Sequence, residues 1–402
     1  MPADAVDVAV VGGGPAGLAT AAAAAAGGLR VVVHGRNPAI GEPVRTSGGS
    51  FVEPLRRLGL PDTCWHPVHR IRVIGPTTDV TKTYRTPVGC VLDVRRTYQW
   101  LGARAVDAGA EIRLKSTVDG LRRDGARVVG IRARDPFRGR YDVDARVVVD
   151  ASGHTGFLAR DAGLRPGNDR SAVGMEVELR APGYDADEAV FWLGDAVAPG
   201  GYGWAFPTGE GRVRLGVGVV RPESDAEPRA LLARLLEVFR AHAGGPAAPV
   251  GALEMHSGLM PVIAPTATRL AADGLLVVGD AGGQGSTLLG EGIRYAIAAG
   301  RLAGESLVRA RGDYTAGGLA AYPREWHRRT RRDLAISYAV NTRICRFGDD
   351  DWDRAVRRME HLTARQAARL FASDFSVRWA LGVLVTHPSL LASVARALRR
   401  RG

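Results

Sequence analysis

The stretch VDVAVVGGGPAG, residues 6–17, decides the fold class of this chain. A short apolar run leads into a glycine-rich turn with the pattern G-x-G-x-x-G, and the alanine-rich residues 18–26 follow at once. In a strand, turn and helix of this kind, the first glycine permits a tight turn, the second lets a pyrophosphate approach the backbone, and the third lets helix and strand pack closely. We therefore predict an α/β, Rossmann-like dinucleotide-binding unit. Its predicted cofactor contacts are Gly12, Gly14, Pro15, Ala16 and Gly17.

The second apolar run, residues 29–33, is predicted to be the next strand of this unit. Sites of this type usually carry an acidic residue at the end of that strand, where it binds a ribose hydroxyl. Here Gly35 stands at that place, between His34 and Arg36. We expect Arg36, a backbone group or a water molecule to make the contact instead.

The composition is that of an ordinary globular protein, with 46% hydrophobic and 24% charged residues among 402. The net charge of +12 comes from basic residues spread along the chain, without a clustered basic helix, so we expect no nucleic-acid partner. The three cysteines have no paired spacing, which predicts neither a disulfide framework nor a metal site.

The N-terminal apolar run is interrupted by glycines and a proline, which argues against a membrane helix and predicts a cytoplasmic protein. A basic tail follows apolar residues near the C-terminus, and such a pattern allows peripheral contact with a membrane surface. The basic residues are Arg396, Arg399, Arg400 and Arg401.

Three later stretches carry further signals. GDAGGQGSTLLGEG, residues 279–292, stands between an apolar run and a helical pattern, so it is predicted to be a loop of a site and not a linker. ARVVVDASGHTG, residues 145–156, predicts a strand ending at Asp150 in a turn that crosses close to the first one. Residues 89–112 predict a helix with Arg95 at its start, where an arginine could reach a phosphate.

Together these stretches resemble the p-hydroxybenzoate hydroxylase-type flavoprotein fold and, within it, the FAD-dependent geranylgeranyl reductase family, over about residues 5–310. In that family a strand ends in Gly-Asp, whose Asp binds the flavin ribitol, and Gly-Glu-Gly then opens a helix below the flavin ring. Asp280 and Gly290-Glu291-Gly292 are similar in kind and spacing. The resemblance implies FAD as the cofactor, with Asp280, Gly290 and Gly292 among its ligands.

A second motif of the family, Tyr-x-Trp-x-Phe-Pro, is matched by Tyr202 to Pro207. Alternation along a strand places Tyr202, Trp204 and Phe206 on one face. The resemblance implies that this face borders the substrate; three core aromatics of a sheet are the alternative.

A third motif, IGEPVRTSGG at residues 40–49, resembles the family's loop beside the flavin, with Thr46 where the family has cysteine. It implies that Arg45 and Thr46 lie at the cofactor, and Val118 is expected there as well. Candidate proton relays are Thr46, Ser47 and Tyr202. We also expect a more polar pocket than the family's, because the 279–292 loop carries Gln284, Ser286 and Thr287.

The resemblance implies a discontinuous FAD-binding domain, an inserted, mainly antiparallel β substrate domain, and a helical C-terminal region. The expected ranges are 1–75, 90–165 and 265–310 for the first, 76–89 and 166–264 for the second, and 311–402 for the third. No second G-x-G-x-x-G follows a later strand, so NAD(P)H or a separate reductant, including an electron-donor protein, is expected to act transiently.

The main functional prediction is reduction of a C=C bond in a hydrophobic, isoprenoid-like or natural-product substrate, by hydride from flavin N5 and a proton. The alternative is a monooxygenase that hydroxylates or epoxidises through a C4a-hydroperoxide, and Thr46 in place of cysteine favours it. A flavin halogenase is a further alternative, because those enzymes combine a similar aromatic motif with a lysine, here Lys82. The last functional alternative is a protein that binds a flavin or a lipid without catalysing a reaction.

Overall fold

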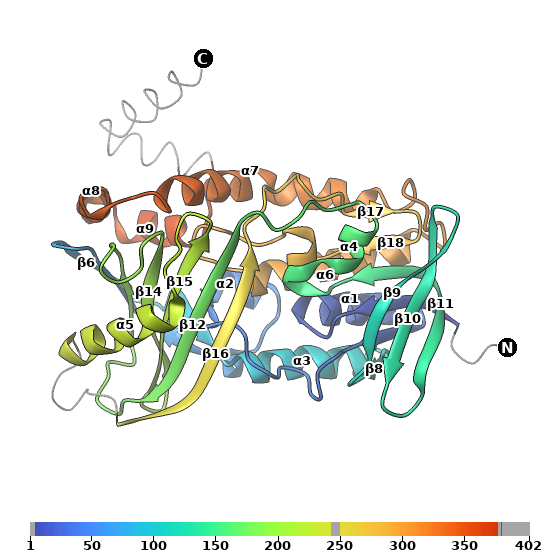
Figure 1. Ribbon diagram of the computed structural model, residues 1–402, viewed down its shortest axis with the longest axis horizontal. Coiled ribbons are helices and arrows are strands. Elements are labelled where there is room, and N and C mark those ends of the chain that lie inside the picture. Colours follow the sequence, from blue (N-terminus) through green and yellow to red (C-terminus); the bar gives the residue numbers. More distant parts are fainter. Residues whose placement is uncertain (1–4, 243–249, 377–378, 380–402) are drawn as a thin grey trace, which may run out of the picture.

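The computed structural model describes residues 5–242, 250–376 and 379. Its strands β9–β11 lie at one end of the molecule and β12, β14, β15 and β16 at the other, with helices α1 and α6 between them (Figure 1). The basic residues predicted to touch a membrane, at 396–401, lie outside the described part.

The first main sheet has the order β17-β18-β11-β1-β2-β8, and β10 and β9 extend it from β11. The pairs from β18 to β8 are parallel, and β1 and β2 are buried valine-rich runs, as expected of strands covered on both faces. Its strands are β1 (Val6–Val11), β2 (Val31–His34), β8 (Glu111–Arg113), β9 (Thr117–Asp124), β10 (Arg127–Asp135), β11 (Gly139–Asp150), β17 (Ala271–Ala272) and β18 (Leu275–Val277).

Helices α1 (Pro15–Ala26) and α6 (Ile293–Arg309) pack on this sheet in very close contact. A Cβ at Gly300 would lie 2.2 Å from the carbonyl oxygen of Ala16, and one at Gly304 would lie 2.5 Å from that of Thr20. The small residues of both helices therefore bring their backbones together, which fixes where α6 begins relative to the first turn.

The helix predicted over residues 89–112 is shorter in the structure, where α3 spans Val94–Asp107. Asp93 caps its start, because its side chain accepts a hydrogen bond of 2.9 Å from the backbone N–H of Arg96. The apolar residues before this cap form β7 (Gly89–Leu92), which pairs in a small sheet with β3 (Gly49–Phe51) and β4 (Trp65–Val68).

The second main sheet has the order β16-β12-β15-β14-β13-β5-β6 and is antiparallel except for the pair β13–β5. Helix α5 (Pro228–His242) covers its outer face with Leu235 and Phe239, both fully buried. The strands are β5 (Arg70–Ile74), β6 (Asp79–Thr83), β12 (Ser171–Arg180), β13 (Glu188–Trp192), β14 (Gly201–Gly209), β15 (Arg212–Arg221) and β16 (Gly251–Pro261). The pairing places β5 in this sheet, although it precedes residue 76, and the domain ranges stay a prediction.

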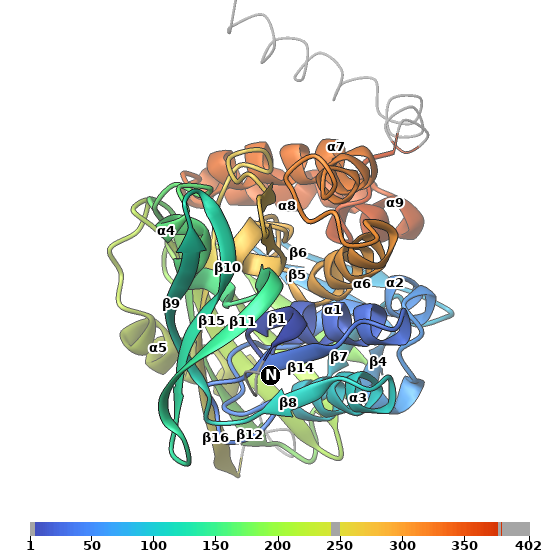
Figure 2. The same ribbon diagram turned by 90° about the vertical axis from the view of Figure 1, so that its right-hand side faces the viewer.

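Helices α7 (Ala321–Ile344), α8 (Asp349–His361) and α9 (Ala364–Phe371) cover one side of the molecule, and α3 lies on the opposite side (Figure 2). The short helices α2 (Val52–Arg57) and α4 (Phe157–Asp161) follow β3 and β11. The predicted α/β class, with an antiparallel second sheet and a helical C-terminal region, is confirmed. Among the described residues, no helix combines the length and apolar character that crossing a bilayer requires.

Candidate active site

A cavity of about 740 Å³ is lined from both main sheets. One side is formed by the turn after β1, the turn after β11 and the loop between β18 and α6. The other side is formed by β12, β14, β15 and β16 of the second sheet. The predicted nucleotide turn and the predicted aromatic wall therefore border one continuous space.

The turns after β1 and β11 cross in contact, as the sequence predicts. The N–H of Ala151 donates a hydrogen bond of 2.9 Å to the carbonyl of Val11, and a Cβ at Gly12 would lie 2.1 Å from the oxygen of Ala151. A Cβ at Gly17 would lie 2.0 Å from the oxygen of Gly12, whereas one at Gly14 would meet no atom within 4 Å. Backbone thus closes around the first and third glycines, while the second faces open space at the start of α1.

The loop at 279–292 is folded back on itself. The backbones of Ser286 and Glu291 exchange two hydrogen bonds of 2.9 and 3.0 Å, and the amide oxygen of Gln284 accepts one of 2.7 Å from the N–H of Gly279. Of the three polar residues expected to enrich the pocket, only Thr287 lines the cavity. The expectation is wrong for Gln284 and Ser286, because their side chains bond to Tyr322 and to Ser337 and Ser373 instead.

Asp280 lines the cavity at the start of this loop. Burial raises the pKa of its carboxyl to about 6, while the positive charge of Arg165 opposes the increase. Arg165 is itself only 5% exposed and donates hydrogen bonds to the carbonyls of Asp280, Ala281 and His154, at 3.0, 3.1 and 3.0 Å. It ties the loop to the turn after β11, and no sequence motif marks it.

Helix α6 begins at the far end of the loop, where Gly290 and Gly292 line the cavity. Glu291 between them points away and holds the helix in place. Its Oε1 accepts hydrogen bonds of 2.7 Å from the Ser50 hydroxyl, next to the 40–49 loop, and of 2.7 Å from Arg294. The helix N-terminus is therefore fixed beside the loop that the resemblance places at the flavin.

The cavity face of the second sheet is arranged in cross-strand rows. Tyr202, Gly218, Gly174 and Gly258 stand opposite one another on β14, β15, β12 and β16, and the last three form what we call the glycine row. The indole of Trp204 lies over Gly216 in the next row and turns its edge toward the glycine row: a Cβ at Gly216 would be 2.3 Å from the ring, and one at Gly174 would be 3.6 Å away. A Cβ at Gly258 would lie 2.1 Å from the carbonyl oxygen of Arg45, so the 40–49 loop covers that end of the row, and the absent side chains of Gly174 and Gly218 make a flat floor beside the aromatic wall.

The aromatic wall itself is formed as predicted, with ring centroids of Tyr202, Trp204 and Phe206 at successive spacings of 5.7 and 6.0 Å. Tyr202 donates a hydrogen bond of 2.6 Å to the carbonyl of Leu289, and burial raises the pKa of its hydroxyl far above the ordinary value. This bond joins the wall to the 279–292 loop.

Most of the predicted site residues meet at the cavity. Those that line it are Gly12, Gly14, Pro15, Ala16, Arg36, Arg45, Thr46, Ser47, Val118, Tyr202, Trp204, Asp280, Gly290 and Gly292. Gly17, Arg95 and Phe206 do not. Gly17 lies behind the turn, Phe206 packs in the core around Phe191, and the Arg95 guanidinium pairs with Glu42 and Glu254 at 2.9 and 3.6 Å.

Comparison with known proteins identifies the family of this chain. A family model of FAD-dependent oxidoreductases matches residues 7–196, and the model of the geranylgeranyl reductase catalytic domain matches residues 171–244. Digeranylgeranylglycerophospholipid reductase 2 of Methanothermobacter thermautotrophicus is 33% identical over 96% of this chain and 97% of its own length. This chain belongs to the geranylgeranyl reductase family. It is accordingly an FAD-dependent oxidoreductase, as the sequence predicts.

Other members of the geranylgeranyl reductase family agree. The digeranylgeranylglycerophospholipid reductase of Methanothrix thermoacetophila is 34% identical over 88% of this chain and 91% of its own. A geranylgeranyl bacteriochlorophyll reductase-like protein from Thermoplasma acidophilum superposes with a TM-score of 0.84 at 25% identity, over 98% of this chain and 99% of the other. These names favour C=C reduction over the monooxygenase alternative.

A flavin-dependent brominase shares the fold, with a TM-score of 0.68 at 18% identity over 99% of this chain and 100% of the other. The lysine that prompts the halogenase alternative does not reach the cavity, however. The Lys82 ammonium donates to the carbonyls of Glu360 and Leu362, at 2.9 and 2.7 Å, and so caps the end of α8. Lys115, the other lysine of the chain, does not line the cavity either.

The residues around the first turn and the 279–292 loop fit FAD in this geranylgeranyl reductase family member. The open space before Gly14 lies at the N-terminus of α1, which attracts a pyrophosphate. Ser152, in the turn after β11, lines the same cavity, as does Asp280. Both are suited to the many hydroxyl and amide groups of the cofactor.

Proposed function

We propose that this protein reduces carbon–carbon double bonds in the isoprenoid chain of a lipid. The observation that carries the proposal is the continuity of the cavity, which runs from the nucleotide turn to the glycine row and the aromatic wall. Bound FAD supplies a hydride for this reaction when it is reduced. The chain's own residues bind the cofactor, orient the alkene and keep water from the reacting carbons.

For the cofactor, we propose that the backbone at Gly12 and Gly14 holds the pyrophosphate and that Asp280 accepts hydrogen bonds from the ribityl hydroxyls. The N–H groups at the start of α6, around Gly290 and Gly292, are available to stabilise negative charge on the flavin ring. Arg36, Arg45, Thr46 and Val118 complete the proposed contacts. Arg95 is not among the proposed FAD contacts, because its guanidinium forms ion pairs with Glu42 and Glu254.

For the substrate, we propose that the alkene chain lies across the glycine row with Trp204 beside it. A floor without side chains suits a flat trisubstituted alkene, since backbone and ring can approach it closely. Beyond the glycine row the lining becomes apolar, with Ala172, Val220 and Met260 opposite one another on three strands. This part suits the rest of a polyisoprenoid chain.

Anaerobic single turnover tests the proposal. The bound FAD is reduced photochemically, the protein is mixed with a geranylgeranyl phospholipid in detergent without oxygen, and flavin reoxidation is followed by absorbance. We expect reoxidation by the alkene and a product that has gained one H₂ per reduced bond. Reoxidation by oxygen alone, with a hydroxylated or epoxidised product, would refute reduction. The donor that reduces the flavin stays a prediction: it is expected to be NAD(P)H or a separate reductant.

A further inference from the structure

A buried charged row ends the floor of the cavity, next to the glycine row. His256, Glu176, Gly216 and Trp204 stand opposite one another on β16, β12, β15 and β14. Nδ1 of His256 lies 2.8 Å from Oε1 of Glu176, and the indole N–H of Trp204 donates to Oε2 of the same carboxylate at 3.1 Å. Glu176 and His256 are 2% and 6% exposed, and both line the cavity.

The second ring nitrogen of His256 also faces a carboxylate. Nε2 lies 3.0 Å from Oε2 of Glu254, which is the neighbour on the same strand face. A neutral imidazole has only one N–H to donate, whereas the imidazolium donates from both nitrogens. Two carboxylates at hydrogen-bond distance therefore favour the charged ring, which can give up the proton on Nδ1 and remain a neutral imidazole.

Burial and the charges on the neighbouring strands together set the pKa of the His256 imidazole. Burial lowers the pKa of the imidazole, but the hydrogen bonds and charges of Glu176 on β12 and Glu254 on β16 raise it, and the net direction is upward. Arg214 on β15 opposes this through its positive charge. The nearest charge from α3 is Arg95, which pairs with Glu254 at 3.6 Å.

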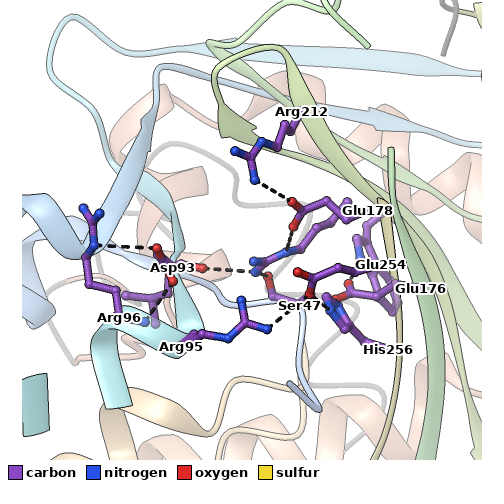
Figure 3. A network of polar contacts seen from close by, with 12 residues as sticks. Ser47, Asp93, Arg95, Arg96, Glu176, Glu178, Arg212, Glu254 and His256 are labelled. Atoms are coloured by element: carbon purple, nitrogen blue, oxygen red, sulfur yellow. Dashed lines mark hydrogen bonds and ion pairs between the residues drawn. The ribbon is translucent and has the colours of Figure 1, made fainter. Parts of the chain in front are cut away.

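Figure 3 shows Glu254, His256 and Glu176 next to one another in this network. The side chain of Glu254 is 41% exposed and does not line the cavity, while His256 and Glu176 behind it do. A proton can therefore enter at Nε2 and leave at Nδ1 of one ring. Gly216 leaves room for Trp204 to reach Glu176, because a Cβ there would be 2.3 Å from the indole and 2.6 Å from the Glu176 side chain.

The adjacent row shows what a purely structural pair looks like in this sheet. Glu178, two residues along β12, pairs at 2.9 Å with Arg214, which also donates to the carbonyls of Ser47 and Leu92. Neither member of this pair lines the cavity, and a guanidinium does not release its proton near neutral pH. Glu176 and His256, by contrast, both line the cavity, and an imidazolium can release its proton near neutral pH.

We propose that Glu254, His256 and Glu176 form a proton path from the surface, with Glu176 as the group that protonates the substrate alkene. The inference rests on the proposed C=C reduction. One alkene carbon gains a hydride from the reduced flavin, which is the reductant and is oxidised, and the other gains a proton that the His256 imidazolium passes from Nδ1 to the Glu176 carboxylate and that Glu176 then delivers. The neutral ring keeps its Nε2–H, and rotation of the ring turns this N–H toward Glu176 and the bare nitrogen toward Glu254, where it takes the next proton from solvent.

The first experiment needs neither substrate nor turnover. In protein with ¹⁵N-labelled histidines, the His256 ring signals are assigned by their loss in His256→Gln and titrated with pH. We expect a pKa above the ordinary value, falling by about one unit or more in Glu176→Gln because an opposite charge at this distance shifts a pKa by that amount. Glu178→Gln, a buried glutamate on the same strand, should move it much less. An ordinary pKa in the unmodified protein overturns the path.

The second experiment is the anaerobic reoxidation of reduced flavin by a geranylgeranyl phospholipid. We expect Glu176→Gln and His256→Gln to slow it about a hundredfold, the usual loss when a general acid is removed, with FAD occupancy unchanged. Glu178→Gln should stay within a few fold. In the unmodified protein the rate should decline as pH rises through the pKa of His256, and His256→Gln should lack that decline.

If the unmodified protein is reoxidised by the alkene and both glutamine variants match its rate per bound flavin, the proton path is wrong while C=C reduction stands. If no alkene reoxidises the unmodified protein, C=C reduction fails and the proton path falls with it. The two failures are therefore distinguished by the unmodified protein alone.

Discussion

FAD binding should weaken in acid because of one carboxyl, that of Asp280. Its pKa in the cofactor-free protein is raised to about 6 by burial. We expect the carboxylate, and not the neutral acid, to accept hydrogen bonds from the ribityl hydroxyls, since bonds to a charged acceptor are stronger. Binding then displaces a proton whenever the pH is below the raised pKa, so affinity must fall as pH falls.

The size of the effect follows from the pKa. A difference of one pH unit is about 1.36 kcal/mol for one proton, so the dissociation constant at pH 5 should be about tenfold higher than its plateau above pH 7. Near pH 6 about half a proton should be released per FAD bound. Isothermal titration calorimetry in buffers of different ionisation enthalpy measures both quantities on the same protein.

Asp280→Asn is the matched variant. Its amide keeps an acceptor oxygen but cannot titrate, so its dissociation constant should be flat between pH 5 and 7. At pH 8 it should bind about fivefold more weakly than the unmodified protein, which corresponds to about 1 kcal/mol for exchanging a charged for a neutral acceptor. A tenfold acid effect that persists in Asp280→Asn would assign it to another group such as Asp150, whose pKa burial also raises. No acid effect in the unmodified protein would refute the ribityl role.

Three further outcomes are expected. Trp204→Ala should weaken apparent substrate affinity about tenfold or more, because it removes the ring beside the alkene, while bound FAD stays; loss of flavin would make Trp204 a core residue. Gly174→Leu should block alkene-dependent reoxidation by filling the floor, whereas Gly174→Ala, which has 3.6 Å of clearance, should retain it. Arg165→Met should lower the free energy of unfolding by about 3 kcal/mol in chemical denaturation, because one buried and two partly buried carbonyls lose their donor; an unchanged midpoint would contradict this.

Local patterns along the chain predict the parts of the site that depend on neighbours in sequence. The turn at Gly12, the loop at Asp280 and the alternation of Tyr202 and Trp204 all follow from residues a few positions apart, and the structure brings them to one cavity. The start of α3 is predicted less well, because the helical pattern over residues 89–112 extends past Asp93, whose side chain caps the helix in the structure.

Contacts that depend on strand register could not be predicted in the same way. Glu176 and His256 are 80 residues apart and meet only because β12 and β16 pair in one register. Alternation places each on a face but does not say which residue stands opposite. Arg165 is similar, since a single arginine between glycine-rich turns gives no periodic signal. The composition of the 279–292 loop likewise does not reveal that the side chain of Gln284 turns inward, to the backbone of Gly279 and the hydroxyl of Tyr322.

Because FAD and the proposed lipid substrate would share one cavity, the amount of bound FAD should affect which apolar molecules the protein binds. Since the nucleotide cradle and the glycine row border one space, the bound flavin ring would form part of the wall against which the proposed lipid substrate packs. Protein made when riboflavin is scarce would present a wider cavity than FAD-loaded protein, with room for other apolar chains such as those of detergents. Saturation with FAD before any lipid or detergent is added should therefore decide which molecules this protein retains during purification.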